Sequence, residues 1–499
     1  MNEKIGELEL NKIYCEDALE LLKKIPDKSV DSIVTDPPAG IEFMGKEWDS
    51  FKENKRSKGW ACQGKEGGDD FGGFGKKLRP AFCSQTNQDL LTFQNFICQV
   101  FTEAIRVIKP GGYALVWAIP RTSHHTAMGL ERAGFEVRDC VYHVFGSGFP
   151  KSMDISQDFD RQACREQLEK ELGRKPTKNE FKEAWKSFRK VIGKQNYSMP
   201  KADNSIQANS YGISGGSLKN GVTAERVIAD LTEPVTLEAK EWEGWGTALK
   251  PAVECWWLVR KPLSEKTVAE NCLKWGTGGI NIEGCRVGHN EPVKTANREQ
   301  RKAGWNPDNC GFDSTQNIVA SANPQGRFPS NLIHDGSDEV VSLFPNSSIT
   351  GKRNKPHLKH EAKNTPFTMG NPLAEYTDSG SASRFFYCAK ASKRERNRGC
   401  EELEEKPIEI QQPHNSKNLE ERYAMTSKNN HPTVKSLELM KYLIKLITPK
   451  KGIVLDMFAG SGSTLIAAKY LGYNFIGIEI SEEYVDIANK RLSQGVLNL

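Results

Sequence analysis

Short apolar runs alternate with segments whose apolar residues recur at helical spacing, first over residues 10–150 and again after residue 428. This alternation predicts the strands and helices of an α/β sheet. The predicted strands cover residues 12–17, 30–38, 113–119, 137–149, 248–262, 453–456 and 474–480, and the predicted helices cover 18–26, 93–112, 124–135, 436–448, 463–471 and a final segment after residue 480.

The middle of the chain does not keep this rhythm. Residues 155–192 are charged and helical in pattern, and residues 193–240 are polar and rich in turns. Because the two α/β parts together supply the strands of one domain, the middle is predicted to be inserted into it. The expected division is 1–154 and 429–499 for the two parts of the α/β domain, 245–264 for a returning strand, and 155–244 and 265–428 for the insertions.

The composition favours a soluble protein of the cytosol. Of the 499 residues, 37% are hydrophobic and 27% are charged, no apolar run is long enough to span a bilayer, and the charged N-terminus lacks the apolar core of a signal peptide. Twelve scattered cysteines without a C-x-x-C pair favour reduced thiols. Cys272, Cys285, Cys310 and His289 match no zinc-binding spacing, so no metal is expected. The net charge of +5 permits a polyanionic partner without requiring one.

A glycine-rich turn follows the predicted strand 453–456. Gly460 and Gly462 allow a ligand to approach the backbone, and Glu479 ends the next strand, where a carboxylate can accept hydrogen bonds from ribose hydroxyls. The turn has neither a Walker lysine nor G-x-G-x-x-G spacing. It therefore favours an adenosyl group with a cationic centre over a phosphate, although a plain strand-to-helix turn has the same pattern.

Two acidic residues each have two interpretations. Asp456 ends its strand and either supplies negative charge near a cationic ligand or caps the glycine turn. Asp17 ends the predicted strand 12–17 and either accepts hydrogen bonds from an adenine amine or forms the N-cap of the helix 18–26. The local pattern around Asp17 slightly favours the cap.

Asp36, Pro37 and Pro38 end another predicted strand, and a glycine- and charge-rich stretch at 50–77 follows. The prolines fix φ and remove two N–H donors, so the loop is rigid and rich in acceptors. Such a site suits an exocyclic –NH₂ that attacks the methyl group of a sulfonium, helped mainly by positioning. A stiff turn is the alternative for the loop, and the following stretch is either a lid over the substrate or a plain disordered insertion.

With both loops considered, the chain resembles the amino-methylating DNA methyltransferases of the β arrangement. In that family an Asp-Pro-Pro-Tyr motif comes first, a target-recognition region follows, and an F-x-G-x-G cofactor motif comes last. Residues 35–39 and 456–464 match the first and last motifs. Residues 430–436 are similar to the N-x-x-HPTxKP signature, with Ser436 in place of a proline. The run that begins at Asp36 is most similar to phage and prophage members.

The resemblance implies a Rossmann-like S-adenosylmethionine-dependent methyltransferase sheet, circularly permuted, with an inserted mixed α+β target-recognition region. The permutation would place the strand with Asp17 beside the strand with Glu479, which raises the adenine-contacting role of Asp17 above the cap. Asp36, Pro37 and Pro38 are then catalytic, and the cofactor is S-adenosyl-L-methionine. Its expected contacts are Asp17, Asp36, Thr433, Lys435, Asp456, Phe458, Ala459, Gly460, Ser461, Gly462, Ser463, Thr464 and Glu479.

One departure from the family concerns the residue after the two prolines. It is usually an aromatic ring that stacks on the extruded base, whereas here it is Ala39. Another ring must supply the stacking, or base binding is weaker. Phe43 and Trp48 are candidates, and we assign the role to Phe145 and Phe149, where the family often places a second aromatic; core packing is the alternative for each.

Residues 265–428 resemble the recognition region in position and composition, which implies duplex DNA as the partner and base flipping as the mode of access. The resemblance favours phosphate contact over a solvated surface for the basic runs of this region. A homodimer is left open, no membrane is expected, and the protein is placed in the bacterial cytosol with the nucleoid. The predicted DNA contacts are Lys352, Arg353, Lys355, Lys390, Lys393, Arg394, Arg396 and Arg398.

Three functions remain open at this point. The first is an N6-adenine DNA methyltransferase of the restriction–modification type, favoured because Asp heads the motif. The second is a cytosine-N4 enzyme on the same fold, in which Ser heads the motif more often. The third is a protein that binds the cofactor and DNA with weak or lost catalysis, an alternative motivated by Ala39.

Overall fold

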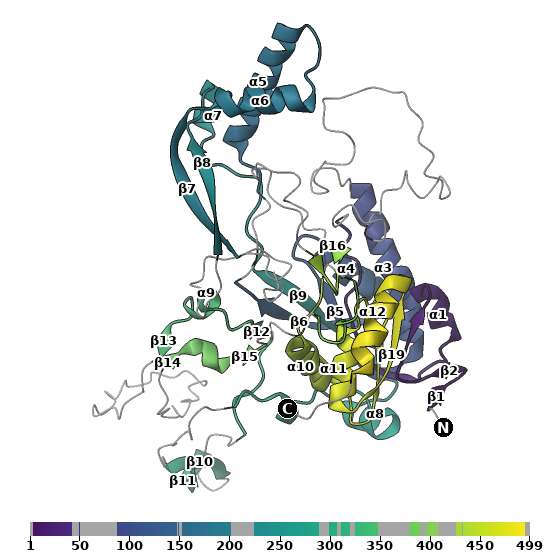
Figure 1. Cartoon of the computed structure of the whole chain (residues 1–499). Coiled ribbons are helices and arrows are strands. Elements are labelled where there is room, and N and C mark those ends of the chain that lie inside the picture. The colour runs from purple at the N-terminus through teal and green to yellow at the C-terminus, as the bar shows by residue number, and fades with distance from the viewer. Residues whose placement is uncertain are drawn as a thin grey trace.

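Strands from both ends and from the middle of the chain form one nine-stranded sheet in the computed structural model (Figure 1). β9 runs antiparallel to both of its neighbours, and the other paired strands of this sheet run parallel, so the fold is α/β as predicted. The order across the sheet is β15 (Tyr387–Cys388), β12 (Leu332–His334), β6 (Glu136–Val144), β9 (Val253–Arg260), β5 (Ile108–Ala118), β4 (Val30–Thr35), β18 (Ile453–Asp456), β19 (Asn474–Glu479) and β3 (Lys12–Cys15).

The structure describes part of the chain, in the ranges given at the end of this paragraph. Within it, no helix has both the length and the apolar character that a membrane crossing requires. The predicted lid at 50–77 lies outside the described residues. These are 3–41, 49, 87–146, 148, 152–200, 224–288, 299–306, 311–319, 325–347, 380–389, 395, 397–404, 406–407, 426–431 and 433–494.

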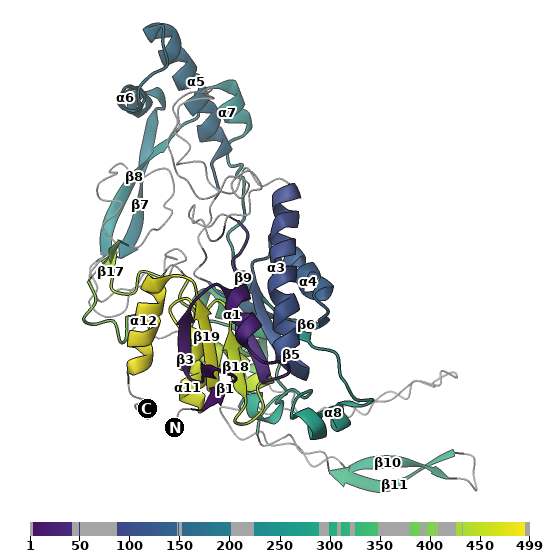
Figure 2. The ribbon, with the colours of Figure 1, turned by 90° about the vertical axis from the view of Figure 1, so that its right-hand side faces the viewer.

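Helices cover both faces of the sheet (Figure 2). Neighbouring residues of a strand point to opposite faces, and β4 shows this directly because Ile33 packs into one core cluster and Val34 into the other. A strand covered on both sides is shielded from water along its whole length, which explains why every residue of β4 is buried, its polar residues included. One face carries α1 (Ala18–Lys24), α3 (Asn87–Val107) and α4 (Ser123–Arg132), and the other carries α10 (Leu437–Ile447), α11 (Ser463–Leu471) and α12 (Glu482–Ser493).

The two ends of the chain meet in the sheet. β3 pairs in parallel with β19, with Ile13 opposite Gly477 and Cys15 opposite Glu479. β18 and β19 lie between β4 and β3, so two C-terminal strands are flanked on each side by an N-terminal strand. The predicted adjacency of the first and last strands is therefore confirmed.

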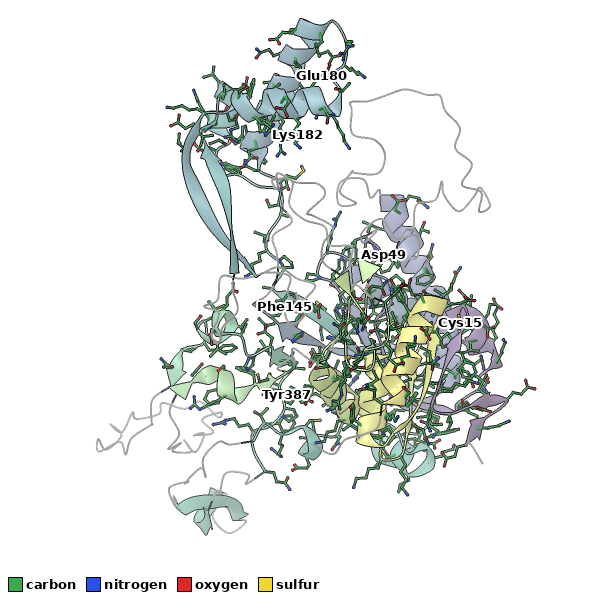
Figure 3. The ribbon with its side chains drawn as sticks, viewed as in Figure 1. Cys15, Asp49, Phe145, Glu180, Lys182 and Tyr387 are labelled. Atoms are coloured by element: carbon green, nitrogen blue, oxygen red, sulfur yellow. The ribbon has the colours of Figure 1, made fainter. Side chains whose placement is uncertain are left out.

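The first insertion forms an arm that stands away from the sheet (Figure 1). Its helices pack on one another, and a buried ion pair of 3.1 Å joins Asp160 of α5 to Arg189, which follows α6. Glu180 and Lys182 lie on this arm, well away from the labelled side chains of the central domain (Figure 3). The arm contains α5 (Ile155–Leu172), α6 (Lys178–Phe188), β7 (Val191–Pro200), β8 (Ala224–Thr232) and α7 (Leu237–Glu241).

The remaining elements are short. α8 (Val268–Trp275) packs on β5, where Asn271 donates a hydrogen bond to the carbonyl of Pro110 at 2.8 Å. The others are β1 (Lys4–Ile5), β2 (Leu8–Glu9), β10 (Glu299–Asn306), β11 (Gly311–Val319), α9 (Asp338–Val341), β13 (Asn346–Ser347), β14 (Gly380–Ser381), β16 (Lys406–Pro407), β17 (Thr426–Ser427) and the 3₁₀ turns η3 (Glu283–Cys285) and η4 (Ala382–Phe385).

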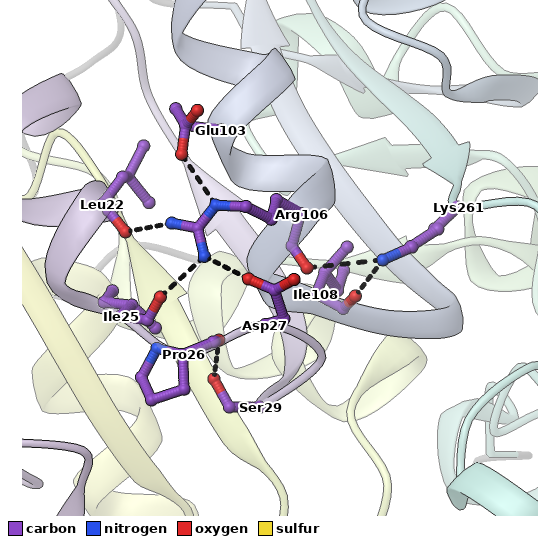
Figure 4. A network of polar contacts seen from close by, with 9 residues as sticks. All are labelled: Leu22, Ile25, Pro26, Asp27, Ser29, Glu103, Arg106, Ile108 and Lys261. Atoms are coloured by element: carbon purple, nitrogen blue, oxygen red, sulfur yellow. Dashed lines mark hydrogen bonds and ion pairs between the residues drawn. The ribbon is translucent and has the colours of Figure 1, made fainter.

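Arg106 ties the ends of two helices together beneath the sheet (Figure 4). Its guanidinium donates to the carbonyls of Leu22 and Ile25 at 2.7 and 2.9 Å, at the C-terminal end of α1, where the carbonyl of Leu22 also accepts from the N–H of Ile25. It also contacts the carboxylates of Asp27 and Glu103 at 2.6 and 2.8 Å. A single cation thus fixes α1 against α3.

Two sequence-based boundaries differ from the structure. The helix predicted over 93–112 begins at Asn87 and ends at Val107, because Ile108 already pairs with Val30 in the sheet. The region 265–428 was treated wholly as an insertion, yet it supplies β12 and β15, which extend the sheet beyond β6. Strands of two or three residues carry too little periodicity to be recognised in a sequence.

Candidate active site

The Asp-Pro-Pro loop and the glycine-rich turn lie side by side at one edge of the sheet. Asp36 follows β4, and the turn follows β18, which pairs with β4 in parallel. The carboxyl ends of parallel strands meet at one edge, which is where ligands bind in open α/β sheets. The antiparallel β9 begins at this same edge, and His143 near the end of β6 is paired with Glu254 at its start. Side chains from the two ends of the chain and from its middle therefore converge here.

A hydrogen bond joins the two loops directly. Thr35, the last residue of β4, donates from Oγ1 to Oδ1 of Asp456 at 2.7 Å. The same carboxylate oxygen accepts from the backbone N–H of Phe458 at 3.1 Å, so Asp456 also caps the glycine turn. Burial raises the pKa of Asp456 to about 6, and these hydrogen bonds oppose that rise. Both interpretations of Asp456 are thus compatible with its position.

The loop after Asp36 is anchored on both sides. Thr122 donates from Oγ1 to the carbonyl of Ala39 at 2.7 Å, and the buried carboxylate of Asp49 accepts from the backbone N–H groups of Gly40 and Ile41 at 2.6 and 3.1 Å. Gly40 has φ +69°, and a Cβ there would lie 2.6 Å from the ring of Phe93. These contacts hold the loop on both sides, and Ala39 belongs to the hydrophobic core.

Lys435 forms an ion pair with Asp36, with 3.0 Å between Nζ and Oδ2. The Asp36 side chain is 19% exposed and that of Lys435 10%. Burial raises the pKa of Asp36, and the Lys435 ammonium partly opposes this rise. Lys435, predicted as a cofactor contact, lies against the Asp-Pro-Pro loop, and Thr433 lies two residues before it.

Glu254 is a member of this cluster that the sequence did not reveal. Its Oε1 lies 4.0 Å from Nζ of Lys435, and its Oε2 lies 3.6 Å from Nδ1 of His143. Burial alone would raise the pKa of Glu254, but Lys435 and His143 lower it to about 2. Nζ of Lys435 also lies 4.1 Å from the centre of the Trp117 ring. An acid within the otherwise apolar strand VECWWLVR was the available signal.

The glycine turn packs closely against neighbouring residues. Gly460 has φ +52°, and a Cβ there would lie 2.6 Å from Nε2 of His431. Its N–H donates to Oε2 of Glu479 at 2.8 Å, and Oε1 of Glu479 accepts from the backbone N–H of Ser481 at 2.9 Å. Burial raises the pKa of Glu479, while these backbone donors oppose the rise. The acid that ends β19 is therefore oriented by the turn itself.

Arg491 supports the turn from behind and was also missed. Its Nη1 donates to the carbonyl and Oγ of Ser461 at 2.6 and 2.9 Å, and to Oγ of Ser463 at 3.3 Å. The residue is 4% exposed, and burial lowers its pKa. No local pattern indicates this role, because Arg491 lies in the last turn of the last helix, where basic residues are common for electrostatic reasons.

Other predicted cofactor residues are placed as follows. Asp17 caps α1, accepting at Oδ1 from the backbone N–H groups of Leu19 and Glu20 at 2.9 and 3.3 Å. The cap that the local pattern favoured is thus present, and Cys15, the last residue of β3, lies opposite Glu479. Within the turn, Phe458 packs near Phe96, and the buried residues are Ala459, Ser461, Ser463 and Thr464.

The predicted base-stacking ring Phe145 is 7% exposed and packs 5.9 Å from the ring of His143. Figure 3 shows it at the edge of the central domain. Of the predicted DNA contacts, Arg398 lies in a described turn, and the others lie outside the described residues, as do Phe149, Phe43 and Trp48: Lys352, Arg353, Lys355, Lys390, Lys393, Arg394 and Arg396. Within the described part of the chain, no group of His, Cys, Asp and Glu side chains is arranged to hold a metal ion.

The chain is similar in sequence to known methyltransferases. Residues 289–490 match the DNA methylase family model N6_N4_Mtase. Over 74 residues the chain is 49% identical to the type II methyltransferase M.HindIII of Haemophilus influenzae, which is 15% of this chain and 24% of that protein. Over 71 residues it is 45% identical to the DNA adenine methyltransferase YhdJ of Escherichia coli K12, which is 14% of this chain and 24% of that one. The chain thus spans about a quarter of each of these relatives.

Among solved structures, a PvuII DNA methyltransferase described as specific for cytosine N4 aligns with 97% of this chain and 87% of its own. The sequence identity is 11% and the TM-score is 0.37. Values this low support no assignment of function.

Proposed function

We propose that this chain, which carries a DNA methylase domain over residues 289–490, transfers a methyl group from S-adenosyl-L-methionine to the exocyclic N6 of adenine in duplex DNA. The observation that carries the proposal is the hydrogen bond from Thr35 to Asp456. It places the acceptor-rich loop, which suits an amine, against the glycine turn, which suits an adenosyl group. A methyl donor and a methyl acceptor would then share one site.

The residues of the glycine turn fit an adenosyl cofactor. The two glycines leave a backbone surface that a Cβ would fill, and Glu479 ends the neighbouring strand with an ionisable carboxylate. When bound, S-adenosyl-L-methionine would supply an electrophilic methyl group. In the proposal Glu479 orients the ribose, Asp456 contributes negative charge near the cationic centre, and Phe458 lines the entrance beside Asp36.

On the acceptor side, Asp36 binds the hydrogens of the target amine. A carboxylate on a rigid loop fixes the nitrogen with its lone pair toward the methyl group, and such positioning lowers the barrier without prior deprotonation. Because Asp36 is only partly exposed, little reorganisation of water is required as the charge develops. Pro37 and Pro38 contribute by holding this geometry.

Duplex DNA is the proposed partner, and the proposed phosphate contacts are Lys352, Arg353, Lys355, Lys390, Lys393, Arg394, Arg396 and Arg398. The target base would have to leave the helix to reach a site at the edge of the sheet. Phe145 is buried beside His143 here, so for Phe145 to stack on an extruded base, the surrounding packing would have to rearrange. A homodimer is compatible with the proposal but nothing in it requires one.

Two alternatives remain. Cytosine N4 presents a similar amine, and the same loop would hold it. The second alternative is a protein that binds cofactor and DNA with little catalysis, and the buried Ala39 favours it because this residue supplies no ring for the base. The methylated nucleoside recovered from treated DNA distinguishes the three functions: N6-methyladenine, N4-methylcytosine or none.

The division of roles is tested by Asp36→Ala. This variant is expected to lose methyl transfer while its affinity for S-adenosyl-L-methionine, measured by isothermal titration calorimetry, changes by less than about threefold. A protein that keeps transfer without Asp36 would contradict the proposed role of the loop. Loss of both activities with an unchanged thermal unfolding midpoint would show that the two loops do not divide the work.

A further inference from the structure

Two carboxylates and one ammonium group from distant parts of the chain meet at the Asp-Pro-Pro loop. Asp36 follows β4, Lys435 precedes α10, and Glu254 is the second residue of β9. Nζ of Lys435 lies 3.0 Å from Asp36 and 4.0 Å from Glu254. The side chains of Lys435 and Glu254 are each 10% exposed. One ammonium group is therefore shared between two carboxylates in a place that water barely reaches.

We propose that Glu254 is a positioning residue that holds Lys435 against Oδ2 of Asp36, leaves Oδ1 for the amine, and keeps Asp36 able to accept the proton that the methylated nitrogen releases. This inference rests on the proposed function. It explains how the orientation and basicity of Asp36 are set. It also gives a role to Glu254, a buried acid that neither the motifs nor the core packing accounts for.

The cost of burial supports the assignment. An acid in a strand covered on both faces loses hydration, and it is retained only where a partner compensates that loss. Glu254 has such partners on both sides, Lys435 at 4.0 Å and His143 at 3.6 Å. With Glu254 removed, Asp36 would keep the nearby ammonium of Lys435 but lose the negative charge of Glu254, and its carboxylate would become a weaker proton acceptor.

The proton balance is simple. As the target nitrogen forms its bond to the methyl carbon, the bond from that carbon to sulfur breaks, and the nitrogen carries a positive charge and one proton too many. Oδ1 of Asp36 accepts this proton and later releases it to water. Lys435 remains an ammonium throughout, and Glu254 remains a carboxylate, because the pKa of Glu254 is held near 2.

The charged groups that face Asp36 predict opposite effects for two variants. Among the residues that the structure describes, they are Lys435, Glu254 and Asp456, while His143 faces Glu254. Burial raises the pKa of Asp36, Glu254 adds to that rise, and Lys435 opposes it. Replacing Glu254 should therefore lower the pKa of Asp36, and replacing Lys435 should raise it.

The test measures kcat/KM for methylation of duplex DNA against pH, since its acid limb reports the essential base of the free enzyme. Glu254→Gln should shift the acid limb to lower pH by about one unit and reduce kcat about tenfold. Lys435→Met should shift the limb to higher pH by a similar amount. The KM for S-adenosyl-L-methionine should change little in Glu254→Gln, and Glu438→Gln, which alters an exposed ion pair, should match the wild type.

Different outcomes separate the two proposals. If the wild type yields no methylated base, the proposed function fails, and this inference fails with it. If the wild type methylates DNA but both variants keep its acid limb, the positioning role is wrong while the function stands. Should Glu254→Gln not fold, Lys435→Met alone decides, because an unchanged or lowered acid limb in that variant contradicts the inference.

Discussion

Gly460→Ala perturbs the glycine turn at its closest approach to the rest of the protein. Gly460 has φ +52°, a region that side chains disfavour, and the added Cβ would lie 2.6 Å from Nε2 of His431. His431 has limited room to move, because its Nδ1 accepts from the N–H of Thr433 at 3.3 Å and its ring packs 4.5 Å from that of Tyr484. The substitution should therefore shift His431 and open the turn.

The magnitude follows from two terms that a matched control separates. Gly472 also has positive φ, +73°, but nothing lies within 4 Å of a Cβ built there. Gly472→Ala should then cost only the backbone term, about 1–2 kcal/mol. Gly460→Ala should cost that amount plus about 1–3 kcal/mol for overpacking. The difference between the two variants measures the contact with His431.

Urea unfolding gives the two free energies, and calorimetry with S-adenosyl-L-methionine gives the functional consequence. Cofactor affinity should fall about tenfold or more in Gly460→Ala, which corresponds to about 1.4 kcal/mol, and should be retained in Gly472→Ala. A second substitution, His431→Ala, should recover part of the lost stability, because it removes the atom that the new Cβ meets. Equal costs for both glycines, or undiminished affinity in Gly460→Ala, would refute this reasoning.

Two further predictions concern buried charge. Arg491→Met leaves the carbonyl of Ser461 without its buried donor, so the free energy of unfolding in urea should fall by about 2–3 kcal/mol. The control Lys490→Met removes an exposed ion pair and should cost less than about 1 kcal/mol. Similar losses in the two variants would argue against the supporting role of Arg491. The folded pKa of Asp456, about 6, exceeds its ordinary value of 3.8, so its contribution is complete below that ordinary value and is lost as pH rises toward 6. Relative to Asp456→Asn, the wild type should lose about 3 kcal/mol between about pH 3 and about pH 7, and a parallel pH dependence in both proteins would contradict the raised pKa.

Much of the fold could be predicted from local pattern. The alternation of apolar runs and amphipathic helices located most strands of the sheet, and the two loops identified its functional edge. The placement of β3 beside β19 was expected from the family's order of motifs and is present in the structure. The short strands β12 and β15 were missed, because elements of two or three residues are specified by the sheet they join and not by their own sequence.

The site was predicted only where residues adjoin a motif. Gly460, Asp456 and Glu479 lie in or next to recognisable patterns, whereas Glu254 and Arg491 reach the site only through tertiary packing. Lys435 was identified but expected at the cofactor, and the structure pairs it with Asp36. Which charges meet across a sheet edge depends on strand order, and a single sequence does not state that order.

The proposed function is tested most directly by what the protein does to DNA. Duplex DNA incubated with the protein and S-adenosyl-L-methionine labelled in its methyl group, then digested to nucleosides and analysed by mass spectrometry, gives the decisive measurement. We predict labelled N6-methyladenine with the wild type and none with Asp36→Ala. Labelled N4-methylcytosine would correct the base, and the absence of any labelled nucleoside from folded, cofactor-binding protein would contradict the central claim.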